Sequence, residues 1–293
     1  MKKLFALLLV MAMFTVACGG DETVVEPVAE TPAEDPPADR IVSLSATATE
    51  ILFAIGAGDL VVAVDSYSNY PDYAPITDLQ AFTPNVEAIA SYEPDLVVMQ
   101  TTAVAAELEA LGITVIQRDA PADFSGVYAQ IEELGRATGF IAQAAELVLE
   151  METEITDLQA DLPDADGLTY YHELGTDLYS LTSSTFVGEI YGLFGLTNIA
   201  DEADPDGALG GYPQLSEEFI LGANPDLIFL ADTIFAEQNA ATIAARPGWG
   251  DLTAVQGGAV VELDDDVASR WGPRVVAFAE AIADVLAEVT AAA

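Results

Sequence analysis

The sequence predicts an α/β protein made of two similar lobes, each a parallel sheet flanked by helices, joined by one long helix. Short apolar segments alternate with amphipathic ones along the chain, two motifs recur in the same order in both halves, and one long apolar stripe separates the halves. Alternating strand and helix signals are typical of right-handed βαβ units and therefore of parallel sheets.

Seven short segments rich in β-branched residues are bounded by turn formers, which is typical of buried strands. The strands are expected over residues 41–45, 60–65, 96–100, 114–118, 168–174, 227–231 and 259–263. Helices are expected over residues 49–55, 86–91, 103–111, 186–194, 216–222 and 274–289.

The apolar stripe predicts a helix within residues 140–162, because its members recur at steps of three and four. They are Ile141, Ala144, Val148, Met151, Ile155, Leu158 and Leu162. At a rise of about 1.5 Å per residue this helix is about 30 Å long, enough to connect a lobe over 40–139 with a lobe over 163–293. A surface helix on a single domain is the alternative.

Two motifs recur in the second half of the chain. Residues 87–99 and 218–230 both place a glutamate seven residues before a Pro-Asp-Leu that opens an apolar segment. Residues 50–56 and 189–195 both run from a glutamate to a glycine with the same spacing. Two lobes of similar fold explain this repeat, although Pro ending a helix and Asp capping a turn can also produce such segments locally.

The N-terminal segment predicts export and lipidation. Residues 1–17 contain two lysines followed by an apolar region of thirteen residues. A helix needs about 20 residues to span a bilayer, so this region is too short to do so. The Ala17-Cys18-Gly19 sequence that follows resembles a bacterial lipobox, with Thr15 as a departure, so Cys18 is expected to carry the lipid. Residues 18–39 are acidic and rich in proline, which favours a solvated tether. An ordinary signal peptide is the alternative.

The charge balance excludes several classes of partner and site. The net charge is -41, and beyond the signal peptide there is no lysine and only six arginines, so nucleic acid is not an expected partner. Solubility in a saline habitat is the favoured explanation of the acidity, with functional cation attraction as the alternative. One histidine is too few for a metal site built from imidazoles, so no resident metal or cofactor is expected.

Ligands of parallel sheets bind beyond the carboxyl ends of the strands. The residues predicted there include Ser43, Asp65, Tyr67, Tyr70, Thr101, His172, Tyr179, Asp232, Arg270 and Trp271. Aromatic rings with hydrogen-bonding tips suit a large amphipathic ligand. No hydrolase, phosphate-loop or dinucleotide motif is found, so an enzyme is not expected. For His172 beside Glu173, a buried structural role is favoured over ligand contact, and both over general base catalysis.

Five segments together are similar to one known family, the iron-siderophore and vitamin B12 periplasmic-binding proteins. They are the Arg-Ile-Val-Ser-Leu and Thr-Glu of residues 40–50, Tyr-Ser-Asn-Tyr-Pro at 67–71, Asn-Val-Glu at 85–87, Pro-Asp-Leu at 94–96 and Gly-Pro-Arg at 272–274. Ala46 replaces the usual proline. The resemblance covers residue 40 to the C-terminus.

The resemblance implies two Rossmann-like lobes joined by a long helix, with the ligand in the cleft between them. The ligand contacts it favours are Tyr67, Tyr70, His172, Tyr179, Arg270 and Trp271. It also implies that Glu87 and Glu218, one per lobe, dock onto arginines of the two permease subunits. The alternative for Tyr67, Tyr70 and Trp271 is that they are packing residues. The alternative for Glu87 and Glu218 is that they are solvated helix residues.

The function expected from the resemblance is that of a monomeric, lipid-anchored, extracytoplasmic binding protein of an ABC importer. The ligand is expected to be a metal chelate, either cobalamin or another corrinoid, or a ferric siderophore. Highly anionic catecholates are disfavoured because they need an arginine cluster. A haem-binding protein of the same class and a surface sensor without a permease are the alternatives; a secreted metal hydrolase is disfavoured by the single histidine.

Overall fold

The computed structural model describes residues 36–101, 103–160, 165 and 167–292. From Pro36 onward the chain forms one compact unit. The predicted signal peptide, the lipidation site Cys18 and most of the predicted tether lie outside the described residues.

The first lobe contains a four-stranded parallel sheet in the order β2-β1-β3-β4. The strands are β1 (Ile41–Leu44), β2 (Val61–Val64), β3 (Leu96–Met99) and β4 (Thr114–Gln117). The helices of this lobe are α1 (Ala46–Ala54), η1 (Gly58–Leu60), α2 (Val86–Ala90), α3 (Ala105–Ala110) and α4 (Phe124–Thr138).

The second lobe repeats this topology with the order β6-β5-β7-β8, again all parallel. The strands are β5 (Thr169–Glu173), β6 (Thr197–Asn198), β7 (Leu227–Leu230) and β8 (Val260–Glu262). The helices are α6 (Phe186–Leu193), η2 (Ile199–Ala203), α7 (Glu217–Ala223), α8 (Ala240–Ala244), η3 (Trp249–Asp251), α9 (Thr253–Gly257), α10 (Asp265–Ser269) and α11 (Val275–Ala292). The predicted fold class of two α/β lobes is confirmed.

All seven expected strands are present within a residue or two of their predicted ends. Strand β6, which has only two residues, helix α4 and the five-residue helices α8, α9 and α10 were not predicted from the sequence. The signal for α4 was present in the sequence, because Asp123 caps its first turn and Val127, Ile131 and Leu134 recur at helical spacing and are buried.

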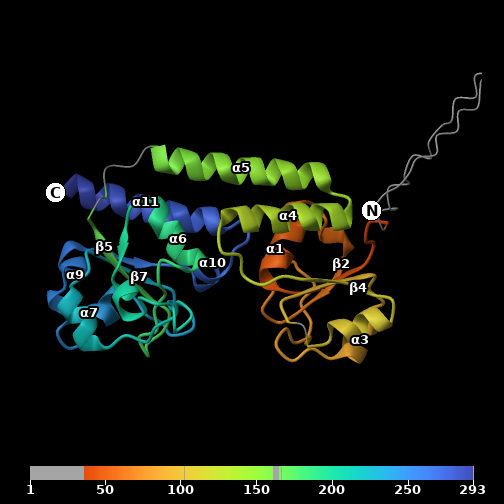
Figure 1. Ribbon diagram of the computed structural model, residues 1–293, viewed down its shortest axis with the longest axis horizontal. Helices are drawn as coiled ribbons and strands as arrows, with labels where there is room; N and C mark the ends of the chain where they lie inside the picture. The colour runs from red at the N-terminus through yellow and green to blue at the C-terminus, as the bar shows by residue number, and fades with distance from the viewer. Residues whose placement is uncertain (1–35, 102, 161–164, 166, 293) are drawn as a thin grey trace, which may run out of the picture. The chain divides into compact units, whose positions relative to one another are not determined.

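Helix α5 (Ile141–Ala160) is the long helix between the two sheets, and it packs against α4 and α11. Figure 1 shows α5 running along both of these helices. Ala144, Met151 and Ile155 of the predicted stripe are buried, whereas Ile141 is exposed. A stripe with a period of 3.5 residues drifts around a straight helix of 3.6 residues per turn, so its first member leaves the packed face. Leu162 lies outside the described residues.

The repeated Pro-Asp-Leu motif has the same structural role in both lobes. The Asp95 carboxylate accepts hydrogen bonds from the Asp39 and Arg40 amides at 2.9 and 3.0 Å, just before β1. The Asp226 carboxylate accepts from the Thr169 amide at 2.9 Å and from its hydroxyl at 2.8 Å, at the start of β5. Each aspartate therefore fixes the start of an inner strand of its own sheet.

The residue before each proline of this motif adopts the same uncommon backbone conformation. Glu93 has φ of 50° and Asn224 has φ of 49°. A left-handed residue ends a helix and turns the chain, so both lobes leave α2 or α7 by the same turn before entering β3 or β7. The internal repeat is thus structural and is not a coincidence of local sequence.

The start of the described chain is attached to the first lobe. The Ala38 amide donates to the Ala137 carbonyl at 2.8 Å, and the Asp39 amide donates to Asp95. This differs from the expectation that a solvated tether extends to Asp39. The Asp95 carboxylate accepts the amides of the residues immediately before β1, and this holds them against the first lobe.

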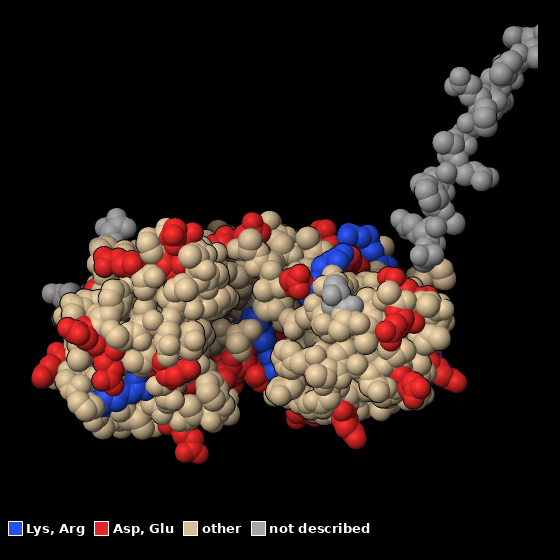
Figure 2. Space-filling model, turned by 60° about the horizontal axis from the view of Figure 1, so that its bottom comes forward, with Lys and Arg blue, Asp and Glu red and all other residues tan. Residues whose placement is uncertain are grey.

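The six arginines are almost all paired. Arg118, Arg136, Arg246, Arg270 and Arg274 each form an ion pair with a carboxylate. Arg40 donates instead to the Tyr92 and Glu93 carbonyls. Figure 2 shows acidic side chains spread over the face in view, with few basic ones among them.

Among the described residues, no helix has both the length and the apolar character that crossing a membrane requires.

The shared role of the motif aspartates is testable by substitution. Replacing Asp226 with alanine should lower the free energy of unfolding by about 2 kcal/mol, because charged hydrogen-bond acceptors contribute about 1.5–3 kcal/mol. Asp95→Ala should cost less, about 1 kcal/mol, because Asp95 is exposed and Asp226 is half-buried. Urea unfolding of both variants, with the exposed Asp251→Ala as control, measures this. Equal and negligible losses in all three would contradict the assigned role.

Candidate ligand-binding site

The parallel strands of each sheet end at a common edge, where the loops after β1, β2, β5, β7 and β8 follow. Figure 2 shows that the surface is hollowed between the two lobes, with basic and acidic side chains in the hollow. The predicted site residues belong to the loops after β2 and β5 and to the segment after α10, with His172 inside β5.

The buried carboxylate of Asp65 fixes the start of the loop after β2. Its side chain is fully buried and accepts from the Tyr67 amide at 2.7 Å and from the Ser68 hydroxyl at 2.8 Å. The loop therefore has a fixed base, although its aromatic rings point outward: Tyr67 is 56% exposed and Tyr70 is 47% exposed. The Tyr67 ring meets the exposed Phe82 edge to face at 5.7 Å. The alternative that these tyrosines are core residues does not agree with their exposure.

The second lobe contributes a similar set of apolar side chains. Tyr179 is 43% exposed, and the backbone around it is held by the Leu174 amide and by a bridge to Gln214. Ile234 and Phe235, which follow β7, are also exposed. Both lobes thus offer exposed rings or apolar side chains on loops that follow their strands.

A buried glutamate joins the two lobes. Glu50, on α1 of the first lobe, accepts from Arg270 at 2.8 Å and from Arg274 at 3.0 and 2.6 Å. The Glu50 side chain is 1% exposed. Its charge is therefore compensated by two guanidinium groups that lie more than 200 residues away in the chain.

Arg270 extends this contact to the loop after β2. It donates to the Tyr67 carbonyl at 3.0 Å, to Asn69 at 2.9 Å and to Asp266 at 2.6 Å. Asn69 in turn donates to Asp266 at 2.9 Å. We call the set Glu50, Asn69, Asp266, Arg270 and Arg274 the interlobe clasp.

The clasp changes the role expected for Arg270. Its side chain is only 9% exposed, and its donors are used by Glu50, Asn69, Asp266 and a backbone carbonyl. The structure therefore does not support direct ligand contact by Arg270. Instead the residue positions the loop that presents Tyr67 and Tyr70.

Gly272 allows the clasp to close. A Cβ atom added at this position would lie 3.2 Å from Glu50 Oε2, which is tighter than ordinary van der Waals contact. The glycine of the Gly-Pro-Arg motif thus leaves room for the carboxylate that Arg274 binds. Arg274 also lies over the Tyr70 ring, with Cζ at 4.2 Å from its centroid.

Trp271 is half-buried and packs against the main core cluster, and its indole N–H donates to Gln130 of α4 at 3.2 Å. This agrees with the alternative that Trp271 is a packing residue. The other tryptophan, Trp249, is fully buried in the second lobe.

His172 is not available to a ligand, so the predicted contact is wrong for this residue. The side chain has no exposed surface, and its Nδ1 lies 2.7 Å from the Tyr191 hydroxyl. Burial lowers the pKa of His172 to about 3, so the imidazole is neutral. The favoured interpretation from the sequence, a buried structural histidine, agrees with this environment.

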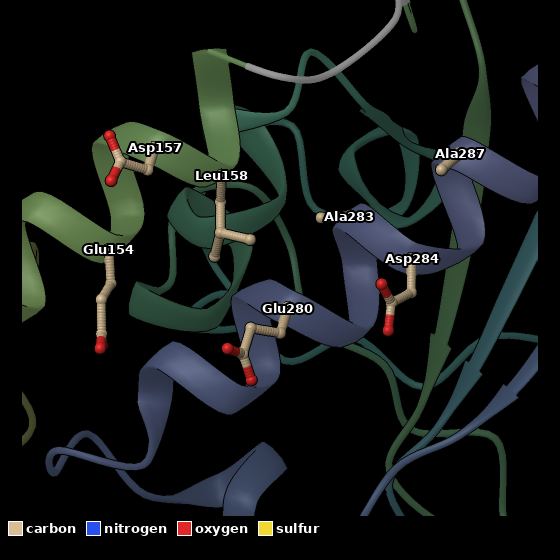
Figure 3. Close-up of a pocket in the computed structure, with 7 residues that line it drawn as sticks. All are labelled: Glu154, Asp157, Leu158, Glu280, Ala283, Asp284 and Ala287. Carbon is tan, nitrogen blue, oxygen red and sulfur yellow. The ribbon is translucent and has the colours of Figure 1, made fainter.

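A depression of about 390 Å³ lies elsewhere, between α5 and α11. Figure 3 shows Glu154 and Asp157 from α5 and Glu280 and Asp284 from α11 around it. Burial, followed by the charges of Glu150 and Glu280, raises the pKa of Glu154. Such a lining repels an anionic ligand and offers no aromatic surface. Within the described residues no group of three or more metal-ligating side chains could hold a metal ion.

The two predicted docking glutamates occupy equivalent positions. Glu87 is the second residue of α2, whose first turn is capped by Asn85, and Glu218 is the second residue of α7, capped by Ser216. Both glutamates are exposed. Each lobe therefore presents one carboxylate at the same place in its fold.

The pairing within the clasp was not predicted from the sequence. Glu50 and Arg274 both belonged to the motifs that carried the family resemblance, and Glu50 also belonged to the repeat. What was absent from the sequence is any sign that these residues meet, because the contact joins α1 with the N-terminal end of α11.

Residues 41–267 match the family model described as periplasmic binding protein. The chain belongs to this family. It is 30% identical over 257 residues to an uncharacterized ABC transporter substrate-binding lipoprotein, YvrC, of Bacillus subtilis, covering 84% of this chain and 79% of that protein. It is 32% identical over 251 residues to a cobalamin-binding protein of Halobacterium salinarum, covering 81% of this chain and 66% of that protein.

Solved structures of periplasmic binding proteins share the fold. The vitamin B12 binding protein BtuF of Vibrio cholerae has a TM-score of 0.71 at 27% identity, covering 87% of this chain and 98% of BtuF. The heme binding protein HutB of Vibrio cholerae has a TM-score of 0.74 at 23% identity, covering 84% of this chain and 98% of HutB. The two-lobed α/β architecture is thus that of the family, whose members are binding proteins.

The clasp should be a major source of stability in this periplasmic binding protein. Glu50→Gln leaves two guanidinium groups without their carboxylate, and removing one partner of a buried ion pair costs about 3–5 kcal/mol. Urea unfolding should show this loss. Glu132→Gln is the matched control, because the Glu132–Arg136 pair is exposed and should contribute at most about 1 kcal/mol. Equal effects of the two substitutions would contradict the importance of the clasp.

Proposed function

We propose that this protein is the substrate-binding component of an ABC importer and that it captures a corrinoid such as cobalamin. The observation that carries the proposal is the set of exposed aromatic and apolar side chains, Tyr67, Tyr70 and Tyr179 among them, on strand-end loops of both lobes. Relatives named as cobalamin-binding and vitamin B12-binding proteins support it.

The distribution of arginines favours a ligand with few negative charges. Arg246, Arg270 and Arg274 compensate buried carboxylates, and Arg118 is paired with Glu133. A catecholate chelate or the propionates of haem would need unpaired guanidinium groups. A corrinoid, or a ferric hydroxamate as the next choice, carries less negative charge and therefore needs fewer unpaired guanidinium groups in the site. The metal would arrive within the chelate, and the protein itself would supply no resident metal or cofactor.

Haem is the second candidate, because heme-binding proteins are among the structures that share the fold. An axial ligand could not come from His172, which is buried and bonded to Tyr191. It would have to come from an exposed tyrosine, such as Tyr67, Tyr70 or Tyr179.

The proposed partner is a permease dimer that meets Glu87 and Glu218. Two carboxylates at equivalent positions of a pseudo-two-fold protein suit arginines on a two-fold permease, since carboxylate–arginine pairs give both steering and geometry. We propose further that the protein is a monomer anchored through a lipid on Cys18 at the extracytoplasmic side of the membrane. A surface sensor without a permease is the alternative that the docking experiment addresses.

Calorimetric titration of the protein with cyanocobalamin, a ferric hydroxamate and haemin tests the ligand. We expect saturable binding of cyanocobalamin in preference to the other two. Tyr67→Ala should weaken this binding by about tenfold, or about 1.4 kcal/mol, because the corrinoid can no longer stack on the Tyr67 ring. Leu149→Ala, an exposed residue on α5, is the control and should change nothing. Preferential binding of haemin would replace the corrinoid proposal with the second candidate.

Charge reversal of the docking glutamates tests the partner. Glu87→Arg and Glu218→Arg should each reduce ligand uptake by proteoliposomes that contain the cognate importer, and the double variant should abolish it. Ligand affinity measured by calorimetry should stay unchanged, because Glu87 and Glu218 lie on helices α2 and α7 and not on the strand-end loops that we propose to bind the ligand. Glu109→Arg, on the exposed face of α3, is the matched control. Unchanged uptake by the double variant would contradict docking through these residues.

A further inference from the structure

Two carboxylates are buried together at the carboxyl edge of the second sheet. Glu173 is the last residue of β5, and Asp232 follows β7 by two residues. The strands are neighbours, and the Ala231 amide donates to the Glu173 carbonyl. Neither side chain has any exposed surface.

Among the described residues, Arg246 is the one cation that acts on both carboxylates. Arg246 donates to the two oxygens of Glu173 at 2.7 and 2.6 Å and to Gln238 at 2.8 Å. Its guanidinium also lies over the Trp249 ring, 4.6 Å from the centroid. The Tyr171 hydroxyl donates to Glu173 at 3.2 Å. The charge of Glu173 is therefore compensated by Arg246, and the Arg246 and Tyr171 donors near the two carboxylates bond to Glu173.

Asp232, by contrast, has no hydrogen-bond donor among the described residues. Both of its carboxylate oxygens are buried, and neither has a hydrogen-bond partner in the part of the chain that the structure describes. An ionised carboxylate in such a place is costly. The other charged groups around it are Glu173 on β5, Arg246 after α8 and Asp265 on α10. Glu262 of the adjacent strand β8 is engaged elsewhere, accepting from the Ala240 amide.

We propose that Asp232 and Glu173 form a buried proton-binding site, in which Asp232 carries a proton and donates it to the carboxylate of Glu173. With one proton bound, the two carboxyl groups and Arg246 sum to zero charge. The second oxygen of Asp232 then needs only to be a neutral carbonyl, which is far less costly to bury than a charge. The site is independent of which ligand the protein takes.

The energetics of the pair agree with this arrangement. Burial, followed by the charge of Glu173, raises the pKa of Asp232 from its ordinary value of 3.8 to about 7, with Arg246 acting in the opposite direction. Asp232 therefore exchanges its proton close to neutral pH, whereas an exposed aspartate is ionised throughout that range.

The proton controls the loop that follows β7. The Asp232 carbonyl accepts from the Ala236 and Gln238 amides, and the Asp265 carboxylate accepts from the Ile234 and Phe235 amides at 2.9–3.1 Å. When Asp232 ionises, its charge is added to those of Glu173 and Asp265, and in the described chain Arg246 is the counterion that faces them. The repulsion should loosen the segment that presents the exposed Ile234 and Phe235.

The direction of the effect on stability is fixed by the raised pKa. Between about pH 4 and 7 the folded protein holds a proton on Asp232 that the unfolded chain has lost. Stability contributed by this site therefore falls as pH rises through that window, and is level above it. The loop should accordingly be best ordered on the acid side of neutrality.

Carbon-13 NMR of the aspartate carboxyl groups of the whole protein tests the site directly. We expect one carboxyl signal that titrates with a midpoint near pH 7 and that is absent from Asp232→Asn. It should remain in the exposed control Asp284→Asn. Should Asp232→Asn fail to fold, the titration of the unmodified protein still decides the matter. If all its aspartates titrate below pH 5, the proposal is overturned.

Hydrogen exchange of the amides of residues 234–238 tests the consequence. After correction for the intrinsic pH dependence of exchange, their protection should fall severalfold between pH 6 and 8 in the unmodified protein. It should not change with pH in Asp232→Asn. Identical profiles in the two proteins would overturn the link between this proton and the loop.

Discussion

The architecture depends on one carboxylate, Glu50, which is removed from water and held by two arginines from the other half of the chain. An isolated buried charge is untenable, so Glu50 requires Arg270 and Arg274 to approach it together. Their approach brings the start of α11 against α1 and, through Arg270, fixes the backbone of the loop after β2. The loop that carries Tyr67 and Tyr70, which we propose as ligand contacts, is thus positioned by an ion cluster.

Half of the chain's few arginines have a structural role. Three of the six compensate buried carboxylates, Arg246 with Glu173 and the other two with Glu50. A buried ionised carboxylate is costly without a cation beside it, and the described chain has no lysine that could replace these arginines. The exposed strand-end loops therefore present aromatic and apolar surface in place of cationic surface, and this supports the proposal of a bulky chelate with little negative charge.

The two lobes share a topology but differ in their charges. Asp95 and Asp226 perform the same task at the start of β1 and β5, so the backbone repeat is maintained by equivalent interactions. The glutamates of the other repeated motif do not remain equivalent. Glu50 meets two arginines, whereas one oxygen of Glu189 is buried with no hydrogen-bond partner in the described part of the chain. Burial, followed by the charge of Asp123, raises the pKa of Glu189. The interface between the lobes is therefore asymmetric although the lobes are alike.

The sequence by itself determined the two-lobed α/β fold, seven of the eight strands and the long connecting helix, because these follow from local periodicity and turn chemistry. It also indicated the exposed tyrosines Tyr67, Tyr70 and Tyr179 through their place after predicted strands. Only the tertiary structure decided that His172 is buried, that Arg270 holds a loop, and that Glu173 and Asp232 share one arginine. Burial and charge pairing join residues distant in the chain, and no local pattern records which of them will meet.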